Sequence, residues 1–345
     1  MGVPPADLPL ATLVGGLVLA APLFIWCRYA GSVASAGGLS AFAASAGGPR
    51  LGRLQAALWT VSYLLYLPYT ITYIVYYLLP ALLPVPPSAL AALEVALPVA
   101  LSLAILRAER GVLQGLAVSA ALQVAAVLAL AALGLARAGW PAPPPVALTA
   151  QLAGGAQVSF FFICLSLVVY LGGEVSPHAM PRILAGAAAL VLALTLLVSP
   201  VVARAPATGL PGVSLVRALG LPAAAATGLG LLTLVSIGGL IAAEFIALVR
   251  LAGHTLGLAR PRAAALIAGL FVVGDAVSLL GPQAFYRLTL APSLVALYAA
   301  QLPVFAAYPF FVRTRRRVRI TDFLIAAAAC LWALYGLYGA VSRLA

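Results

Sequence analysis

The stretch LLTLVSIGGLIAAEFIALVR, residues 231–250, decides the class of fold. Before Arg250 its only charged residue is Glu244, and the rest is apolar, small or hydroxylated. The length is close to the roughly 20 residues that cross a bilayer as an α-helix. This stretch therefore predicts a transmembrane helix that ends at a charged loop.

Comparable stretches recur along the whole chain, which is 64% hydrophobic and only 8% charged. A soluble protein carries about 25% charged residues. We therefore predict an all-α membrane protein with about ten transmembrane helices in a single polytopic domain, residues 1–345. The expected spans are 8–27, 55–84, 88–106, 112–136, 153–172, 183–203, 222–249, 263–281, 288–312 and 320–342.

All 19 basic residues are arginines, and their distribution predicts the topology. With the loop after the first span in the cytoplasm, fourteen arginines lie on the cytoplasmic side and five on the other. Cytoplasmic loops of membrane proteins are enriched in positive charge. Both termini are therefore expected outside. The cytoplasmic set is Arg28, Arg50, Arg53, Arg107, Arg110, Arg182, Arg250, Arg260, Arg262, Arg313, Arg315, Arg316, Arg317 and Arg319.

Three connectors differ from tight turns. Residues 28–52 are rich in Gly, Ala and Ser, and predict a helix at the cytoplasmic surface, broken at Gly37–Gly38 and Gly47–Gly48. Residues 137–150 are rich in proline and cannot continue a helix. Residues 250–262 interleave leucines with polar groups, a pattern that predicts an interfacial helix.

The span at 55–84 carries a polar stripe, because Ser62, Tyr66 and Tyr69 or Thr70 recur at a spacing of three to four residues. Pro68 removes one backbone hydrogen bond and predicts a kink. Two interpretations stay open at this point. The hydroxyls bond to neighbouring carbonyls in helix packing, or they line a path for a substrate.

Two stretches together resemble the amino acid–polyamine–organocation (APC) superfamily of permeases. SAGGLSAFAASAGGPRLGRLQAALWTVSYLLYLPYTITYIVYYLLP, residues 35–80, is similar to the family's Gly-Gly loop and third helix. FFFICLSLVVYLGGEVSPHAMPR, residues 160–182, is similar to its sixth helix and the following loop. The resemblance implies two inverted five-helix repeats, with a substrate bound at the midplane between discontinuous helices.

The chain departs from that pattern in two places. Its first span matches the family's second helix, so the fold is expected to be an N-terminally truncated version of the family's, and a partner subunit is one source of the missing helix. At the expected break of the sixth helix the chain has Cys164 and Ser166 in place of a glycine and an acid. Breaking the helix is then harder, although Ser159 and Ser166 are able to satisfy freed backbone groups.

The resemblance, together with the polar stripe, implies a substrate site. Phe160 falls where the family has an aromatic side chain that closes over the substrate, and aromatic packing is its alternative role. The expected substrate-binding residues are Ser62, Tyr66, Thr70, Phe160, Ile163, Cys164, Ser166, Thr233 and Ser236.

Three acids lie well inside spans, away from their ends: Glu94, Glu244 and Asp275. A charge at a helix centre costs roughly 2.5–3.5 kcal/mol on insertion scales, so each acid is a candidate for proton coupling. The alternative is a structural role, with the carboxylate paired to a hydroxyl or an arginine.

These observations favour a secondary active transporter in the plasma membrane, carrying amino acids or related small organic cations or zwitterions, either coupled to protons or exchanging substrates. The alternative is a non-transporting membrane subunit or a degenerate remnant of such a permease. No nucleophile triad, phosphate loop or metal-binding spacing occurs in the sequence. We therefore expect no enzymatic activity, no cofactor, no metal and no nucleic-acid partner; the expected partners are a small-molecule substrate and the lipid bilayer.

Overall fold

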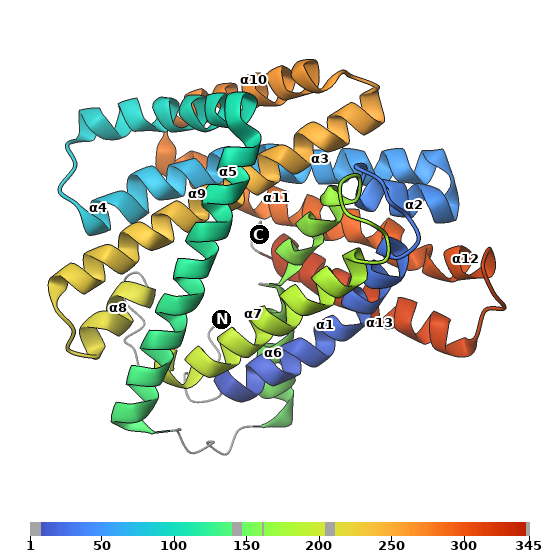
Figure 1. Ribbon diagram of the computed structural model, residues 1–345, viewed down its shortest axis with the longest axis horizontal. Coiled ribbons are helices and arrows are strands. Elements are labelled where there is room, and N and C mark those ends of the chain that lie inside the picture. The colour runs from blue at the N-terminus through green and yellow to red at the C-terminus, as the bar shows by residue number, and fades with distance from the viewer. Residues whose placement is uncertain (1–7, 140–146, 161, 204–210, 343–345) are drawn as a thin grey trace. The chain divides into compact units, whose positions relative to one another are not determined.

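The computed structural model describes residues 8–139, 147–160, 162–203 and 211–342 of the chain (Figure 1). These residues form helices and no strands. Within them, nine helices are long and apolar enough to cross a membrane. The chain is therefore an all-α, multi-pass membrane protein.

The elements are α1 (Leu8–Ala30), α2 (Leu39–Gly47), α3 (Pro49–Tyr73), the π-helix η2 (Ile74–Leu78), α4 (Leu79–Leu82), α5 (Pro87–Ala138), α6 (Leu148–Phe160), the 3₁₀ helix η3 (Ile163–Leu171), α7 (Met180–Val202), α8 (Pro211–Ala218), α9 (Ala223–Leu256), α10 (Arg260–Ser278), α11 (Pro282–Ala306), α12 (Tyr308–Arg313) and α13 (Ile320–Val341).

The spans expected at 88–106 and 112–136 both lie in α5, which is kinked between them, so the two expected helices are present and joined directly. Residues 107–110, RAER, are strong helix formers, and they join the two arms without a loop. Ala108 alone leaves the helical region, with φ −144° and ψ 44°. Figure 1 shows the two arms of α5 running in different directions from this bend. A straight helix of 52 residues would be about 78 Å long, more than twice the hydrocarbon thickness.

The first cytoplasmic connector contains the helix that its glycines predict. α2 lies between Gly38 and Gly48, whose φ values are +53° and +83°. Its first five residues, Leu39–Ala43, are buried and not spread on a surface as expected. α2 contacts α11, α12 and η3, which explains this burial. The second expected connector helix, at 250–262, is absent, because α9 continues to Leu256 and ends at Gly257 (φ +65°).

The helix that carries the polar stripe changes geometry later than expected. α3 continues through Pro68, and the departure from α-helix is the π-helical turn at Ile74–Leu78. Pro68 packs against α10, where a methyl group added to Gly274 would lie 3.0 Å from the proline Cγ. This close approach brings α3 and α10 together beside Asp275.

The stretch at 153–172, expected as one span, forms two elements of different geometry. α6 ends at Phe160, and the chain resumes as the 3₁₀ helix η3 at Ile163. Ser159 Oγ donates to Ala156 O at 2.6 Å, and Ser166 Oγ donates to Ile163 O at 2.8 Å. Both serine hydroxyls thus bond to the backbone on either side of the change, as the sequence suggested.

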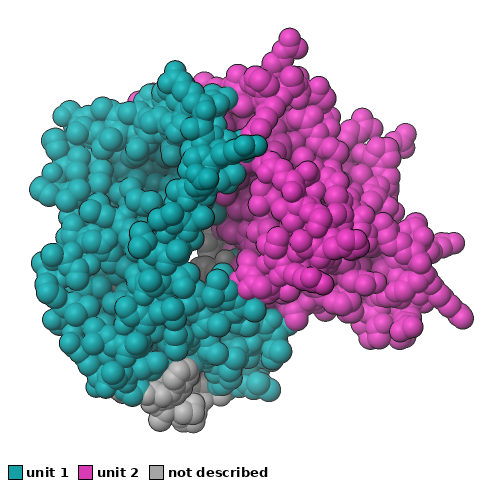
Figure 2. Space-filling view, in the orientation of Figure 1, with its two compact units in different colours: residues 1–17, 70–161, 189–242 teal, residues 18–69, 162–188, 243–345 magenta. Residues whose placement is uncertain are grey.

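The chain divides into two compact units, coloured separately in Figure 2. Unit 1 contains residues 1–17, 70–161 and 189–242, and unit 2 contains residues 18–69, 162–188 and 243–345. The boundaries fall inside α1, α3, α7 and α9, so each of these helices contributes one part to each unit. The expectation of a single membrane domain stays a prediction.

The bulky core lies in unit 2. Among the described residues, all twelve of the largest fully buried side chains belong to this unit. Ten of the twelve are aromatic, and several form ring contacts; Trp26, for example, lies 6.0 Å from Phe305 and 6.4 Å from Trp332. The twelve are Trp26, Trp59, Tyr29, Tyr63, Tyr170, Tyr308, Phe42, Phe245, Phe271, Phe305, Ile25 and Leu39.

Candidate functional site

A buried polar cluster in unit 2 joins three elements: α3, η3 and the last part of α9. The ring of Trp59 lies 4.1 Å from the ring of Tyr63 on α3 and 4.4 Å from the ring of Tyr170 on η3. Tyr63 interacts electrostatically with Cys164 on η3 and with Glu244 on α9. Cys164 interacts with Glu244 as well. We refer to Tyr63, Cys164 and Glu244 as the Glu244 cluster.

Glu244 is fully buried, and neither of its carboxylate oxygens has a hydrogen-bond partner among the described residues. The hydroxyls of Ser62 and Tyr63, which are 1% and 2% exposed, also lack a hydrogen bond within the described part of the chain. Buried polar groups without partners are uncommon and costly in folded proteins. Glu244 and Tyr63 are two such groups, and they lie close together on α9 and α3.

A line of tyrosines leads away from this cluster along α3. The ring of Tyr66 lies 6.2 Å from Tyr63 and 5.5 Å from Tyr69. Tyr69 in turn stacks at 4.5 Å on Tyr286 of α11, and its hydroxyl donates to the Tyr286 hydroxyl at 2.9 Å. Tyr66 is half-buried. These rings give α3 a continuous aromatic face with polar tips.

An ion pair joins α9 to the loop that follows η3, close to Tyr170. Arg250 of α9 donates to the backbone oxygen of Tyr170 at 3.1 Å and to Glu174 Oε1 at 2.6 Å. Gly38 packs on the Tyr170 ring so closely that an added methyl group would lie 2.5 Å from it. The last turns of α9 and the end of η3 are thereby fixed against each other and against the start of α2.

The other expected residues of unit 2 have different surroundings. Ile163 is buried, and Ser166 is fully buried with its hydroxyl bonded to the backbone as described above. Asp275 on α10 is fully buried and directly follows Gly274 at the contact with Pro68. Cys164 is half-buried and interacts electrostatically with Glu244.

The remaining expected residues belong to unit 1: Thr70, Glu94, Phe160, Thr233 and Ser236. Glu94 is fully buried, and Thr72 Oγ1 donates to its Oε1 at 2.5 Å. The hydroxyl of Thr233 donates to Leu229 O at 2.8 Å within the same helix. The structure therefore brings Cys164 near Glu244, has Ser62 in the same unit, and places these five residues in the other unit. Their joint role in a substrate site stays a prediction.

Sequence reasoning missed Tyr63 as a site residue, along with the supporting residues Trp59 and Gln55. A signal was available, because residues 55, 59, 62, 63 and 66 share one face at helical spacing, and Gln55 is a fully buried amide. The stripe chosen from the sequence followed Ser62, Tyr66 and Thr70 and so was displaced to one side of this face.

The cluster offers groups for binding. A buried carboxyl with a hydroxyl nearby is able to hold a proton, or to attract the amine of a small cation. Among the described residues, no three His, Cys, Asp or Glu side chains gather as metal ligands. No protein-family model and no curated protein matches this chain.

Proposed function

We propose that this multi-pass membrane protein is a secondary active transporter of amino acids or related small organic cations or zwitterions, resembling APC permeases, and that it acts in the plasma membrane. Glu244 serves as the residue that binds and releases the coupling proton. The observation that carries the proposal is the Glu244 carboxyl, fully buried in unit 2 and without a hydrogen bond among the described residues.

The physical argument rests on the cost of a charge in the membrane. An ionised carboxylate at a helix centre costs roughly 2.5–3.5 kcal/mol, so a buried acid without a partner favours its protonated form. When the site opens to water, the same group ionises and releases its proton. An acid that alternates between these two states is suited to couple a proton gradient to the movement of a substrate.

The change from α6 to the 3₁₀ helix η3 supports the same function. Transporters with inverted repeats bind substrates beside discontinuous helices, whose freed backbone groups contact the ligand. Here Cys164 follows the change closely and interacts with Glu244. The resemblance to APC permeases supports the choice of amino acids and organic cations as the substrate class.

Uptake by the purified full-length chain in liposomes tests the proposal. A panel of radiolabelled cationic and zwitterionic amino acids is offered with an acidic exterior and a neutral lumen. At least one amino acid should accumulate, and dissipating the proton gradient should stop its accumulation. Glu244→Gln should reduce accumulation to the level of empty liposomes while retaining exchange of labelled for unlabelled substrate, because exchange requires no net proton movement.

Glu94→Gln is the matched control, since Glu94 is equally buried but accepts a hydrogen bond from Thr72. This variant should keep gradient-driven accumulation. If Glu244→Gln accumulates substrate as the unmodified protein does, Glu244 has no coupling role. If no substrate of the panel enters by accumulation or exchange, the transporter proposal is wrong and the non-transporting subunit is favoured.

A further inference from the structure

The corner between α12 and α13 in unit 2 carries a dense group of arginines. Five of the seven residues in 313–319 are arginines. Two of them are engaged within the protein. Arg316 forms hydrogen bonds of 2.7 and 3.0 Å with both carboxylate oxygens of Asp322, and the Arg315 guanidinium lies 3.8 Å above the ring of Phe311.

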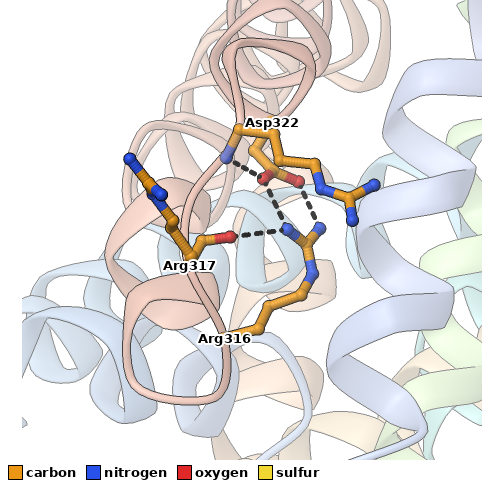
Figure 3. A network of polar contacts seen from close by, with 4 residues as sticks. Arg316, Arg317 and Asp322 are labelled. Atoms are coloured by element: carbon orange, nitrogen blue, oxygen red, sulfur yellow. Dashed lines mark hydrogen bonds and ion pairs between the residues drawn. The ribbon is translucent and has the colours of Figure 1, made fainter.

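The same contacts give the loop a fixed shape. Arg316 also donates to Arg317 O at 3.0 Å, and the backbone N–H of Arg319 donates to Asp322 Oδ2 at 2.9 Å. The hydrogen bonds to Asp322 raise the pKa of Arg316 above its ordinary value. Figure 3 shows this network, with the Arg317 side chain directed away from the Asp322 carboxylate. Binding an anion at this corner therefore requires little further ordering of the backbone.

Positive charge remains on this corner after its one acid is used. Arg313 and Arg317 are exposed and form no ion pair with any described residue. Arg50, at the start of α3, is likewise exposed and unpaired within the described residues. The topology predicted from the sequence places all three at the cytoplasmic face, where anionic lipid headgroups attract arginine side chains.

An apolar groove lies beside these arginines. It has a volume of about 340 Å³ and is lined by small and apolar residues of α2, α3, α11 and α12, among them Gly47, Leu51, Ala306 and Phe310. Arg313 follows Phe310 by one helical turn on α12, and Arg50 directly precedes Leu51 on α3. Arginines therefore adjoin the groove on both of these helices.

We propose that this groove and its arginines bind an anionic phospholipid. One acyl chain lies in the groove, and the phosphate of the headgroup is held by Arg313, Arg317 and Arg50. The apolar lining selects a lipid over a soluble anion, and the uncompensated positive charge selects an anionic headgroup over a zwitterionic one. This site is separate from the Glu244 cluster and does not depend on the transport proposal.

Native mass spectrometry of the full-length protein in detergent tests the site. Phosphatidylglycerol and phosphatidylcholine with identical acyl chains are titrated in parallel. We expect saturable binding of phosphatidylglycerol and weaker binding of phosphatidylcholine. Arg313→Gln combined with Arg317→Gln should weaken phosphatidylglycerol binding about 30-fold, at about fivefold per arginine, and should weaken the binding of phosphatidylcholine, whose headgroup has no net charge, by a smaller factor.

The charge-matched control is Arg217→Gln combined with Arg287→Gln, which removes two exposed arginines predicted to lie on the opposite face. This control should leave the affinity for phosphatidylglycerol unchanged. If the control loses as much affinity as the Arg313 and Arg317 variant, binding depends only on the net charge of the protein, and the proposed site is wrong.

The groove is tested separately with Ala306→Trp, which should weaken the binding of the full-length lipid. Ala306→Leu serves in its place if the tryptophan variant fails to fold by circular dichroism. Displacement of the lipid by millimolar inorganic phosphate, or binding unaffected by filling the groove, would also refute a lipid site.

Discussion

Unit 2 is packed around aromatic rings, whereas unit 1 is packed mainly with aliphatic side chains. Every one of the largest fully buried side chains noted above lies in unit 2. The defined apolar cluster of unit 1 is built instead on Val213, Val216 and Ala226. Aromatic rings fix one arrangement, while leucine and valine side chains repack more easily. The candidate site lies in the unit with the aromatic core, and we expect such a core to preserve a binding geometry better.

The two units also hold their buried acids differently. In unit 1 the Glu94 carboxylate accepts a hydrogen bond from Thr72. In unit 2 the Glu244 carboxylate has none among the described residues. Proteins often keep unfavourable groups at functional sites, at a cost in stability. Under the function proposed above, Glu94 has a structural role and Glu244 a functional one, and three measurements of stability can break or sharpen this contrast.

The largest expected effect is on the aromatic core. Trp26→Ala should lower the free energy of unfolding by about 3 kcal/mol, the lower end of the range for tryptophan truncation, because lipid reduces the transfer part of the cost. Val201→Ala in unit 1, a residue that is 3% exposed, should cost about 1–2 kcal/mol. Reversible unfolding in mixed micelles measures both. An equal or larger loss for Val201→Ala would place the stability core in unit 1.

The next effect concerns the two acids. Thr72→Val keeps the side-chain shape but removes the donor to Glu94, so the protein should lose about 2 kcal/mol of stability. Glu244→Leu removes a buried acid that has no hydrogen bond within the described residues. Its unfolding free energy should stay the same or rise. The same unfolding assay compares them, and a loss of stability in Glu244→Leu similar to that in Thr72→Val would show that Glu244 is structural.

Most helices of the fold were predicted from the apolar runs and the positions of glycines in the sequence. The helix boundaries that were not predicted have local causes. The apolar spans were predicted because a helix that crosses the bilayer requires a long run of apolar residues. The boundaries of α2 were predicted because a positive φ favours glycine. The bend at Ala108 falls in the break predicted between the spans 88–106 and 112–136. The continuation of α9 past Arg250 was not predicted. A charged residue predicts where the bilayer ends, but it does not stop a helix.

The candidate site was predicted only in part. Glu244 is conspicuous as an acid in an apolar helix, and Cys164 was found from the resemblance. Tyr63 was missed because its role depends on contacts with η3 and α9, which lie about 100 and 180 residues away in the chain. Such proximity is a tertiary property that the periodicity of one helix does not contain.

The smallest expected effect on stability is that of alanine substitutions at two glycines, one packed against a side chain that can move and one against a side chain that cannot. A methyl group added to Gly239 in unit 1 would lie 2.6 Å from Leu116 Cδ2, and one added to Gly274 in unit 2 would lie 3.0 Å from Pro68 Cγ. Distance alone predicts that Gly239→Ala is the more harmful change. The nature of the neighbour predicts the opposite, because a leucine tip rotates away whereas a proline ring inside a helix is fixed.

Alanine also favours a helix over glycine by about 1 kcal/mol. Gly239→Ala should therefore be neutral or stabilising by up to about 1 kcal/mol, since Leu116 yields. At Gly274 the strain of overpacking, about 1–3 kcal/mol, should exceed that gain and leave a net loss of about 1 kcal/mol. Paired unfolding curves of the two variants decide the matter through the sign of their difference. If Gly239→Ala is the less stable variant, unit 1 is packed as rigidly as unit 2, and the contrast between the units does not extend beyond the identity of their side chains.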